Sequence, residues 1–98
     1  MGYRGCVDAK QQAYSFYWSL DGDLSSVKRE CERHQNCVGI TWGEWNRKGL
    51  ILVDATGVDN GFSGNKKIVH VDKGTGPIST VGKLHFQATC YAYRAGKV

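Results

Sequence analysis

The sequence has little proline, no low-complexity segment and no apolar run of membrane-spanning length. Pro77 is the single proline, and charged and apolar residues are intermixed along all 98 positions, which excludes extended disorder. No internal repeat is present, and the opening MGYRGCVDAK lacks the apolar region of a signal peptide. A chain of this length and composition predicts one domain over residues 1–98, with a single small core.

Motifs for catalysis and for cofactor binding are also missing. His34, His70 and His85 have no serine or cysteine partner fixed by a motif, as a nucleophile and its base would require. Asp21 and Asp23 are typical of a turn and a helix cap, not of paired catalytic carboxylates. We therefore expect neither enzymatic activity nor a metal or cofactor.

The charge balance favours acidic partners. The net charge is +4 and the isoelectric point is about 9.0, but the basic residues are scattered and no nucleic-acid reader motif is present. We therefore expect no nucleic-acid partner. Sulfated or otherwise anionic glycans would be attracted by the same charge.

One amphipathic helix is predicted to begin at Asp23, which can cap the N–H groups of the first turn. Leu24, Val27 and Cys31 recur at helical spacing on one apolar side, while the charged residues between them face water. The helix should end near His34, because turn-forming residues follow it.

The segment after this turn resembles a strand. Val38, Ile40 and Trp42 alternate as they would on one face of a half-buried strand. Cys31 and Cys37 bracket the turn, and in an oxidising compartment a bond between them would stabilise the fold by about 2 kcal/mol on the chain-entropy model. Four cysteines nevertheless permit three pairings, and their spacing alone does not select one.

Alternating segments predict about five strands in total. In the aromatic segment 13–20, an extended chain places Tyr14, Phe16, Trp18 and Leu20 on one face, which we interpret as core, with a binding platform as the alternative. Further strands are predicted in residues 1–12 around Cys6, in 50–53, in 66–71, and in 83–93 with Leu84, Phe86, Ala88 and Cys90 inward. Short turns connect these segments, so we expect an α+β fold with one helix packed across an antiparallel sheet.

The candidate ligand-binding loop is the polar segment 43–49. Trp45 lies there among hydrogen-bonding residues and could stack on a sugar or anchor a protein partner. The alternative is that Trp45 folds back over the sheet edge. With two lysines and a tyrosine from elsewhere, the candidate set is Trp45, Asn46, Arg47, Lys66, Lys67 and Tyr91.

The segment Cys37-Val38-Gly39-Ile40-Thr41-Trp42, preceded by a helix that ends in a cysteine, resembles the core of the PAN/apple domain family. Gly5-Cys6-Val7 and Thr89-Cys90-Tyr91 are similar to the family's terminal cysteine motifs. The resemblance implies the pairs Cys6–Cys90 and Cys31–Cys37. It also implies that one family bridge is absent, because Val27 and the segment 49–52 stand where its two cysteines would be.

Two metal sites were considered as alternatives. Cys31, His34, Cys37 and Cys90 offer four soft ligands for zinc, but their spacing is unusual and we expect His34 to face solvent. Asp54, Asp59 and Asn60 could bind calcium, but they match no EF-hand loop.

The resemblance implies a non-catalytic recognition module, secreted or on the cell surface, whose natural precursor is longer than this chain. We expect it to bind carbohydrate, in a lectin-like or adhesive role, without inserting into a membrane. The alternative is a protein–protein interaction module of a larger protein. A second alternative is a cytosolic thiol or zinc protein.

Overall fold

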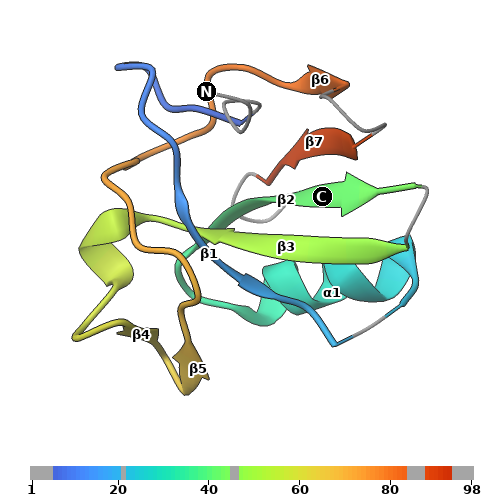
Figure 1. Ribbon diagram of the computed structural model, residues 1–98, viewed down its shortest axis with the longest axis horizontal. Coiled ribbons are helices and arrows are strands. Elements are labelled where there is room, and N and C mark those ends of the chain that lie inside the picture. Colours follow the sequence, from blue (N-terminus) through green and yellow to red (C-terminus); the bar gives the residue numbers. More distant parts are fainter. Residues whose placement is uncertain (1–5, 21, 45–46, 84–87, 94–98) are drawn as a thin grey trace.

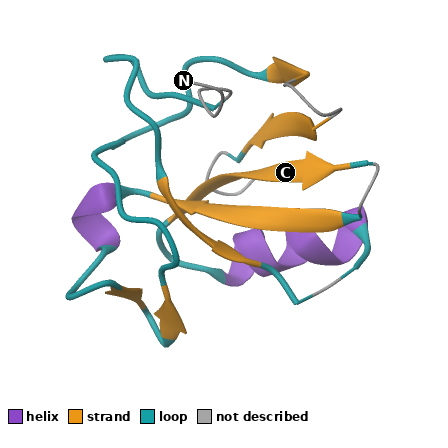
Figure 2. Cartoon of the chain, viewed as in Figure 1, coloured by secondary structure: helices purple, strands orange, loops and turns teal. Residues whose placement is uncertain are grey.

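The computed structural model describes residues 6–20, 22–44, 47–83 and 88–93. Five strands form an antiparallel sheet in the order β1-β3-β2-β7-β6, and a helix packs across one face (Figures 1 and 2). The elements are β1 (Ser15–Trp18), α1 (Leu24–Arg33), β2 (Cys37–Gly43), β3 (Lys48–Val53), the 3-10 helix η1 (Ala55–Gly57), β4 (Phe62–Ser63), β5 (Lys66–Lys67), β6 (Gly82–Lys83) and β7 (Ala88–Ala92). Strands β4 and β5 form a separate two-stranded sheet. The predicted α+β architecture is confirmed.

Helix α1 has the predicted ends and the predicted buried face. Asp23 is its N-cap and accepts a hydrogen bond from the backbone N–H of Ser26 at 3.2 Å, and His34 is its C-cap. Val27 and Cys31 are buried. These local signals suffice because a cap and an apolar stripe specify a helix without reference to distant residues.

Val27 packs where the resemblance places the missing bridge. A Cβ added at Gly49 would lie 2.7 Å from the Cγ1 of Val27, so helix and strand approach closely at this point. The Val27 side chain therefore packs directly against the beginning of β3.

The two faces of the main sheet carry separate cores. The helix-side core consists of Tyr17, Val27, Cys31, Cys37, Ile40, Trp42, Ile51, Val53 and Ile68. The opposite core consists of Cys6, Tyr14, Leu52 and Cys90, with Phe16, Val38, Leu50 and Ile78 packed against it. Successive residues of β3 alternate between the two cores, as the period of a strand requires.

A β-bulge changes the predicted alternation in β2. Cys37 pairs with Val53, but Gly39 already pairs with Leu52, so one extra residue enters β2 between them. Val38 consequently packs on the opposite core, while Ile40 lies in the helix-side core. The prediction that both share one face was wrong.

The predicted strand 83–93 is two antiparallel strands instead of one. Gly82 pairs with Cys90 and Lys83 with Thr89, so the chain reverses between β6 and β7. Cys90 is buried, as predicted. The predictions for Leu84, His85 and Phe86 lie outside the described residues.

Two other predicted strands are shorter or absent. Only Lys66–Lys67 of the segment 66–71 is a strand, and the chain then continues beside β1, where the backbone of His70 pairs with Phe16. Among residues 6–12 there is no strand, only a bridge between Val7 and Ala13. Both segments are held by tertiary contacts, which local alternation does not report.

Both predicted disulfides are present. Cys6 pairs with Cys90 across a sequence separation of 84, and Cys31 pairs with Cys37 across a separation of 6. No cysteine is free, so none is left as a thiolate for a zinc site or a thiol function. Disulfides in a small domain are compatible with an extracellular location. Within the described ranges, no helix is long and apolar enough to cross a membrane.

Candidate functional site

The four predicted binding residues that the structure describes do not come together. Trp45 and Asn46 lie outside the described residues. Arg47 is exposed and immediately precedes β3, with a positive φ of 53° in the tight turn where its N–H donates to Gly43.

Lys66 and Lys67 are exposed on β5, at the other end of the molecule. Lys66 pairs with Ser63, which contacts His34 at the C-terminal end of α1. Arg47 lies instead beyond the start of β3, roughly 20 Å from the end of that strand at about 3.3 Å per residue. These two basic groups therefore cannot contact one small ligand together.

Tyr91 lies on the helix side of β7, apart from both groups. It is half-buried, and the Nζ of Lys28 lies 4.6 Å from its ring centroid. A shallow groove of about 70 Å³ opens here, lined by Lys28, Cys31, Gly39, Ile40, Tyr91, Ala92 and Tyr93.

Exposed apolar side chains lie on and just after β1, where we had predicted core. Trp18 is 48% exposed and Leu20 is 93% exposed, so the core interpretation was wrong for both. The physical reason is that β1 is an edge strand and α1 covers the face from which Tyr17 projects. Tyr14, on the other face, is buried as predicted.

Three rings form what we call the aromatic row: Trp18, Phe16 and His70. The rings of Phe16 and Trp18 meet edge to face, with centroids 6.5 Å apart and an interplanar angle of 80°. His70 stacks on Phe16 with centroids 5.0 Å apart and an interplanar angle of 23°. His70 lies 52 positions after Trp18 in the sequence, so the row joins two distant segments.

Ser15 fixes the segment that carries His70. Its buried Oγ accepts a hydrogen bond from the N–H of Asp72 at 2.8 Å and donates one to the carbonyl of the same residue at 3.2 Å. The backbone N–H of Phe16 also donates to the carbonyl of His70 at 3.0 Å. The aromatic row is therefore preformed, since its two segments are joined by backbone-directed bonds.

Charged groups lie beside two of the three rings of the aromatic row. The Nζ of Lys48 lies 5.9 Å from the ring centroid of Trp18. At the other end, Nε2 of His70 lies 3.0 Å from Oδ2 of Asp72. Burial acts to raise the pKa of Asp72, but the hydrogen bond from His70 and the N–H of Lys73 outweigh it and lower that pKa below its ordinary value, so the carboxylate is charged at neutral pH.

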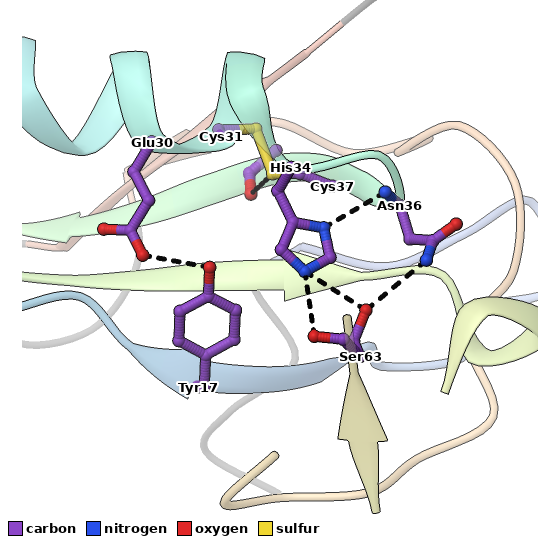
Figure 3. Close-up of a disulfide and its surroundings, with 8 residues drawn as sticks. Tyr17, Glu30, Cys31, His34, Asn36, Cys37 and Ser63 are labelled. Atoms are coloured by element: carbon purple, nitrogen blue, oxygen red, sulfur yellow. Dashed lines mark hydrogen bonds between the residues drawn. A yellow bond between two sulfur atoms is a disulfide. The ribbon is translucent and has the colours of Figure 1, made fainter. Parts of the chain in front are cut away.

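We had predicted that His34 faces solvent, and this was wrong. His34 joins the helix end to β4 (Figure 3). Its Nδ1 accepts a hydrogen bond from the N–H of Asn36 at 3.1 Å. We therefore assign the proton of the neutral ring to Nε2, which lies 3.3 Å from the carbonyl and 3.2 Å from Oγ of Ser63. Ser63 is fully buried.

This His34–Ser63 contact does not have the geometry of a nucleophile and its base. A base needs a free lone pair toward the hydroxyl, whereas Nε2 of His34 carries the proton. The pair links β4 to the helix end.

Of the residues considered for calcium, Asp54 has other partners for its carboxylate. Asp54 caps η1, accepts from the N–H of Thr56 at 2.8 Å and accepts from the N–H of Gly76 at 2.8 Å. Asp59 and Asn60 are exposed. Over the described parts of the chain, no three His, Cys, Asp or Glu residues are grouped to hold a metal ion.

Sequence reasoning missed His70 and Asp72 as site residues. The alternation of Phe16 and Trp18 was visible, but the segment that supplies the third ring lies far along the chain. The only local sign of a site in that segment was that His70 and Asp72 are polar residues two positions apart, a spacing typical of many strands.

Comparisons of the chain with protein-family models, with curated proteins and with solved structures found no match. The similarity to the PAN/apple family consequently stays a prediction that rests on the short cysteine motifs.

Proposed function

We propose that this domain is a non-catalytic recognition module that binds carbohydrate through the aromatic row. The observation that carries the proposal is the half-exposed Trp18, held beside Phe16 and His70 on a preformed strand edge. Indole and imidazole rings offer flat apolar faces to the C–H groups of a sugar, and nearby polar groups fix its orientation.

Asp72 supplies the polar part of this mechanism. Each carboxylate oxygen has two lone pairs, so acceptor capacity remains beyond the bonds from His70 and the N–H of Lys73. A sugar stacked on the row can donate hydroxyl hydrogen bonds to it. The combination of one stacking surface with one fixed acceptor favours a sugar over a purely apolar ligand.

The proposal moves the centre of the predicted site from the 43–49 loop to β1. Arg47 immediately precedes Lys48, whose side chain lies by Trp18, so this end of the loop borders the row. Lys66, Lys67 and Tyr91 have no part in it, because they lie on other elements. Trp45 and Asn46 stay candidates through their position in the same loop.

We also propose a secreted or cell-surface setting and kinship with PAN/apple modules. Two disulfides and the α+β arrangement support this. The Cys6–Cys90 disulfide joins two residues 84 positions apart, near the two ends of the chain, as the resemblance implies.

A protein partner is the second candidate. Val69 and Val71 are 55% and 62% exposed on the segment that carries His70, and Leu20 follows Trp18. Apolar residues around an aromatic centre are typical of protein interfaces.

A glycan array with the oxidised domain tests the proposal. We expect the wild type to bind a defined set of oligosaccharides and Trp18→Ala to lose most of that binding, because one stacking ring is removed. Phe62→Ala is the matched control, since Phe62 is a similarly exposed aromatic residue on β4, at 45%, and is not one of the three rings of the row. Absence of glycan binding, or equal losses in both variants, would overturn the carbohydrate proposal.

A further inference from the structure

The segment between η1 and β4 contains a tight turn that takes no part in the proposed binding surface. Asp59 and Phe62 pair through two backbone hydrogen bonds, of 2.6 Å and 2.9 Å, and Asn60 and Gly61 form the turn between them. Asn60 has a φ of 53° and Gly61 has a φ of 83°. Two consecutive left-handed residues define a type I′ turn, for which Asn-Gly is a preferred pair.

Asn60-Gly61 is also the one Asn-Gly pair in the sequence. An asparagine followed by glycine is prone to lose its side-chain nitrogen, because glycine has no Cβ to block the approach of its backbone nitrogen to the amide carbon. Asn60 is exposed, and a Cβ at Gly61 would meet nothing within 4 Å. Within the described part of the chain, no hydrogen bond engages the Asn60 side chain or the Gly61 N–H.

The reaction at such a pair consumes only water. The backbone nitrogen of Gly61 forms a bond to Cγ of Asn60, its proton and the side-chain nitrogen leave as ammonia, and a succinimide ring results. Water then adds to one of the two ring carbonyls and the ring opens. Cleavage at the Cγ carbonyl gives aspartate. Cleavage at the backbone carbonyl gives isoaspartate, in which the main chain runs through Cβ and Cγ.

Opening of the turn controls this reaction. In a type I′ turn the Gly61 nitrogen points away from the Asn60 side chain, so ring closure requires the turn to open. Among the described residues, the Asp59–Phe62 pair holds the turn closed. One further bond runs from the N–H of Ile68 to the carbonyl of Gly61, at 2.8 Å. The strands that follow, β4 and β5, have two residues each, and such short exposed elements open at low free energy.

The isoaspartate product changes a connection that leads to the aromatic row. It adds one carbon to the backbone, so the turn cannot keep both its closing pair and the bond to Ile68. Ile68 is buried in the helix-side core. The next two residues, Val69 and His70, donate backbone hydrogen bonds to the carbonyl of Phe16. Displacement of Ile68 therefore loosens the segment that places His70 beside Phe16.

From these observations we infer that Asn60 is a site of spontaneous deamidation, and that isoaspartate formed there loosens the segment that carries His70. The substrates are the chain itself and water. The inference is independent of what the aromatic row binds, because both of its parts are measured on the domain alone.

The test incubates the oxidised domain at neutral and at mildly alkaline pH and maps its peptides by mass spectrometry. We expect loss of the asparagine at position 60, with an aspartate and an isoaspartate product, before either control asparagine reacts. Conversion should be faster at alkaline pH, because the attacking nitrogen must lose its proton. Asn36 and Asn65 are the internal controls, since neither is followed by glycine.

Hydrogen exchange measures the effect on the row. In the isoaspartate form, the amides of Val69 and His70 should exchange faster than in the fresh protein. Asn60→Asp introduces the same charge without the extra carbon, and Asn60→Gly keeps a left-handed turn that cannot deamidate. Both variants, measured fresh, should keep the exchange of the wild type, and Asn60→Gly should keep it after incubation.

Conversion at Asn60 that is no faster than at Asn65 would overturn the inference. Isoaspartate that leaves the exchange of Val69 and His70 unchanged would also overturn it, since the turn would then have no effect on that segment. If fresh Asn60→Asp exchanged as fast as the isoaspartate form, the added charge would be the cause, and the role given to the longer backbone would be wrong.

Discussion

The phenol of Tyr17 on β1 donates a hydrogen bond of 2.9 Å to Oε2 of Glu30 on α1. The other carboxylate oxygen, Oε1, accepts from the hydroxyl of Ser19 at 2.7 Å. Burial raises the pKa of Tyr17, and the hydrogen bond to Glu30 adds to that shift, so the phenol keeps its proton throughout the physiological range. Glu30 thereby fixes the edge strand to the helix.

Tyr17→Phe should lower the free energy of unfolding by about 1.5–3 kcal/mol, the usual worth of a hydrogen bond to a charged group. Urea denaturation measures this loss. In a double-mutant cycle, Tyr17→Phe should couple with Glu30→Gln and be additive with Glu32→Gln, since Glu32 is exposed on the same helix. If Tyr17→Phe were additive with both Glu30→Gln and Glu32→Gln, the Tyr17–Glu30 hydrogen bond would contribute nothing to stability.

Gly49→Ala should destabilise the domain by about 1–3 kcal/mol, because the new methyl group overlaps Val27 and the helix must move. Thermal unfolding measures the change. Gly22→Ala is the matched control, since a Cβ at Gly22 meets no atom within 4 Å. Equal unfolding temperatures for the two variants would contradict the close approach of helix and strand.

The two disulfides should contribute unequally to stability. Replacing Cys6 and Cys90 by alanine should cost about 4–5 kcal/mol, and replacing Cys31 and Cys37 about 2 kcal/mol, because the longer loop restricts the unfolded chain more. Denaturant unfolding of the two double variants gives both values. A larger loss for the Cys31–Cys37 pair would reverse this expectation.

Acid should destabilise the domain through Asp8, whose buried carboxylate accepts backbone hydrogen bonds. Burial acts to raise the pKa of Asp8, but N–H donors from Gln12, Thr75 and Lys10 outweigh it and lower that pKa. A group whose folded-state pKa lies below its unfolded value stabilises the fold above the unfolded pKa. That stabilisation is lost as the pH falls through the folded pKa.

We therefore expect the unfolding temperature to be level near neutral pH and to fall below a pH of about 4. Asp8→Asn should lower stability at neutral pH and flatten this acid slope. Ser25→Ala, an exposed helix position without a titrating side chain, should follow the wild type. Parallel curves for the wild type and Asp8→Asn would rule out Asp8 as a contributor.

The parts predicted correctly from the sequence are those with local causes. Helix α1 follows from the Asp23 cap and the spacing of Val27 and Cys31, all within one segment. The bulge at Val38 and the reversal between β6 and β7 depend on how neighbouring strands pair. The local sequence of those segments does not predict either feature.

The candidate site shows the same limit. The shared face of Phe16 and Trp18 follows from alternation, but the exposure of Trp18 depends on which face α1 covers. The third ring, His70, reaches the row because Ser15 binds the Asp72 backbone and the backbone of Phe16 pairs with that of His70. Both are tertiary contacts between distant segments.

The Cys6–Cys90 bond also has a mechanical consequence. Tension that enters the chain before Cys6 and leaves after Cys90 passes directly through the sulfur atoms, so the loop of residues between them carries no load. In a single-molecule pulling experiment, the oxidised domain should extend only after reduction. As a link in a strained chain, it would keep its binding surface intact while the segments on either side stretch.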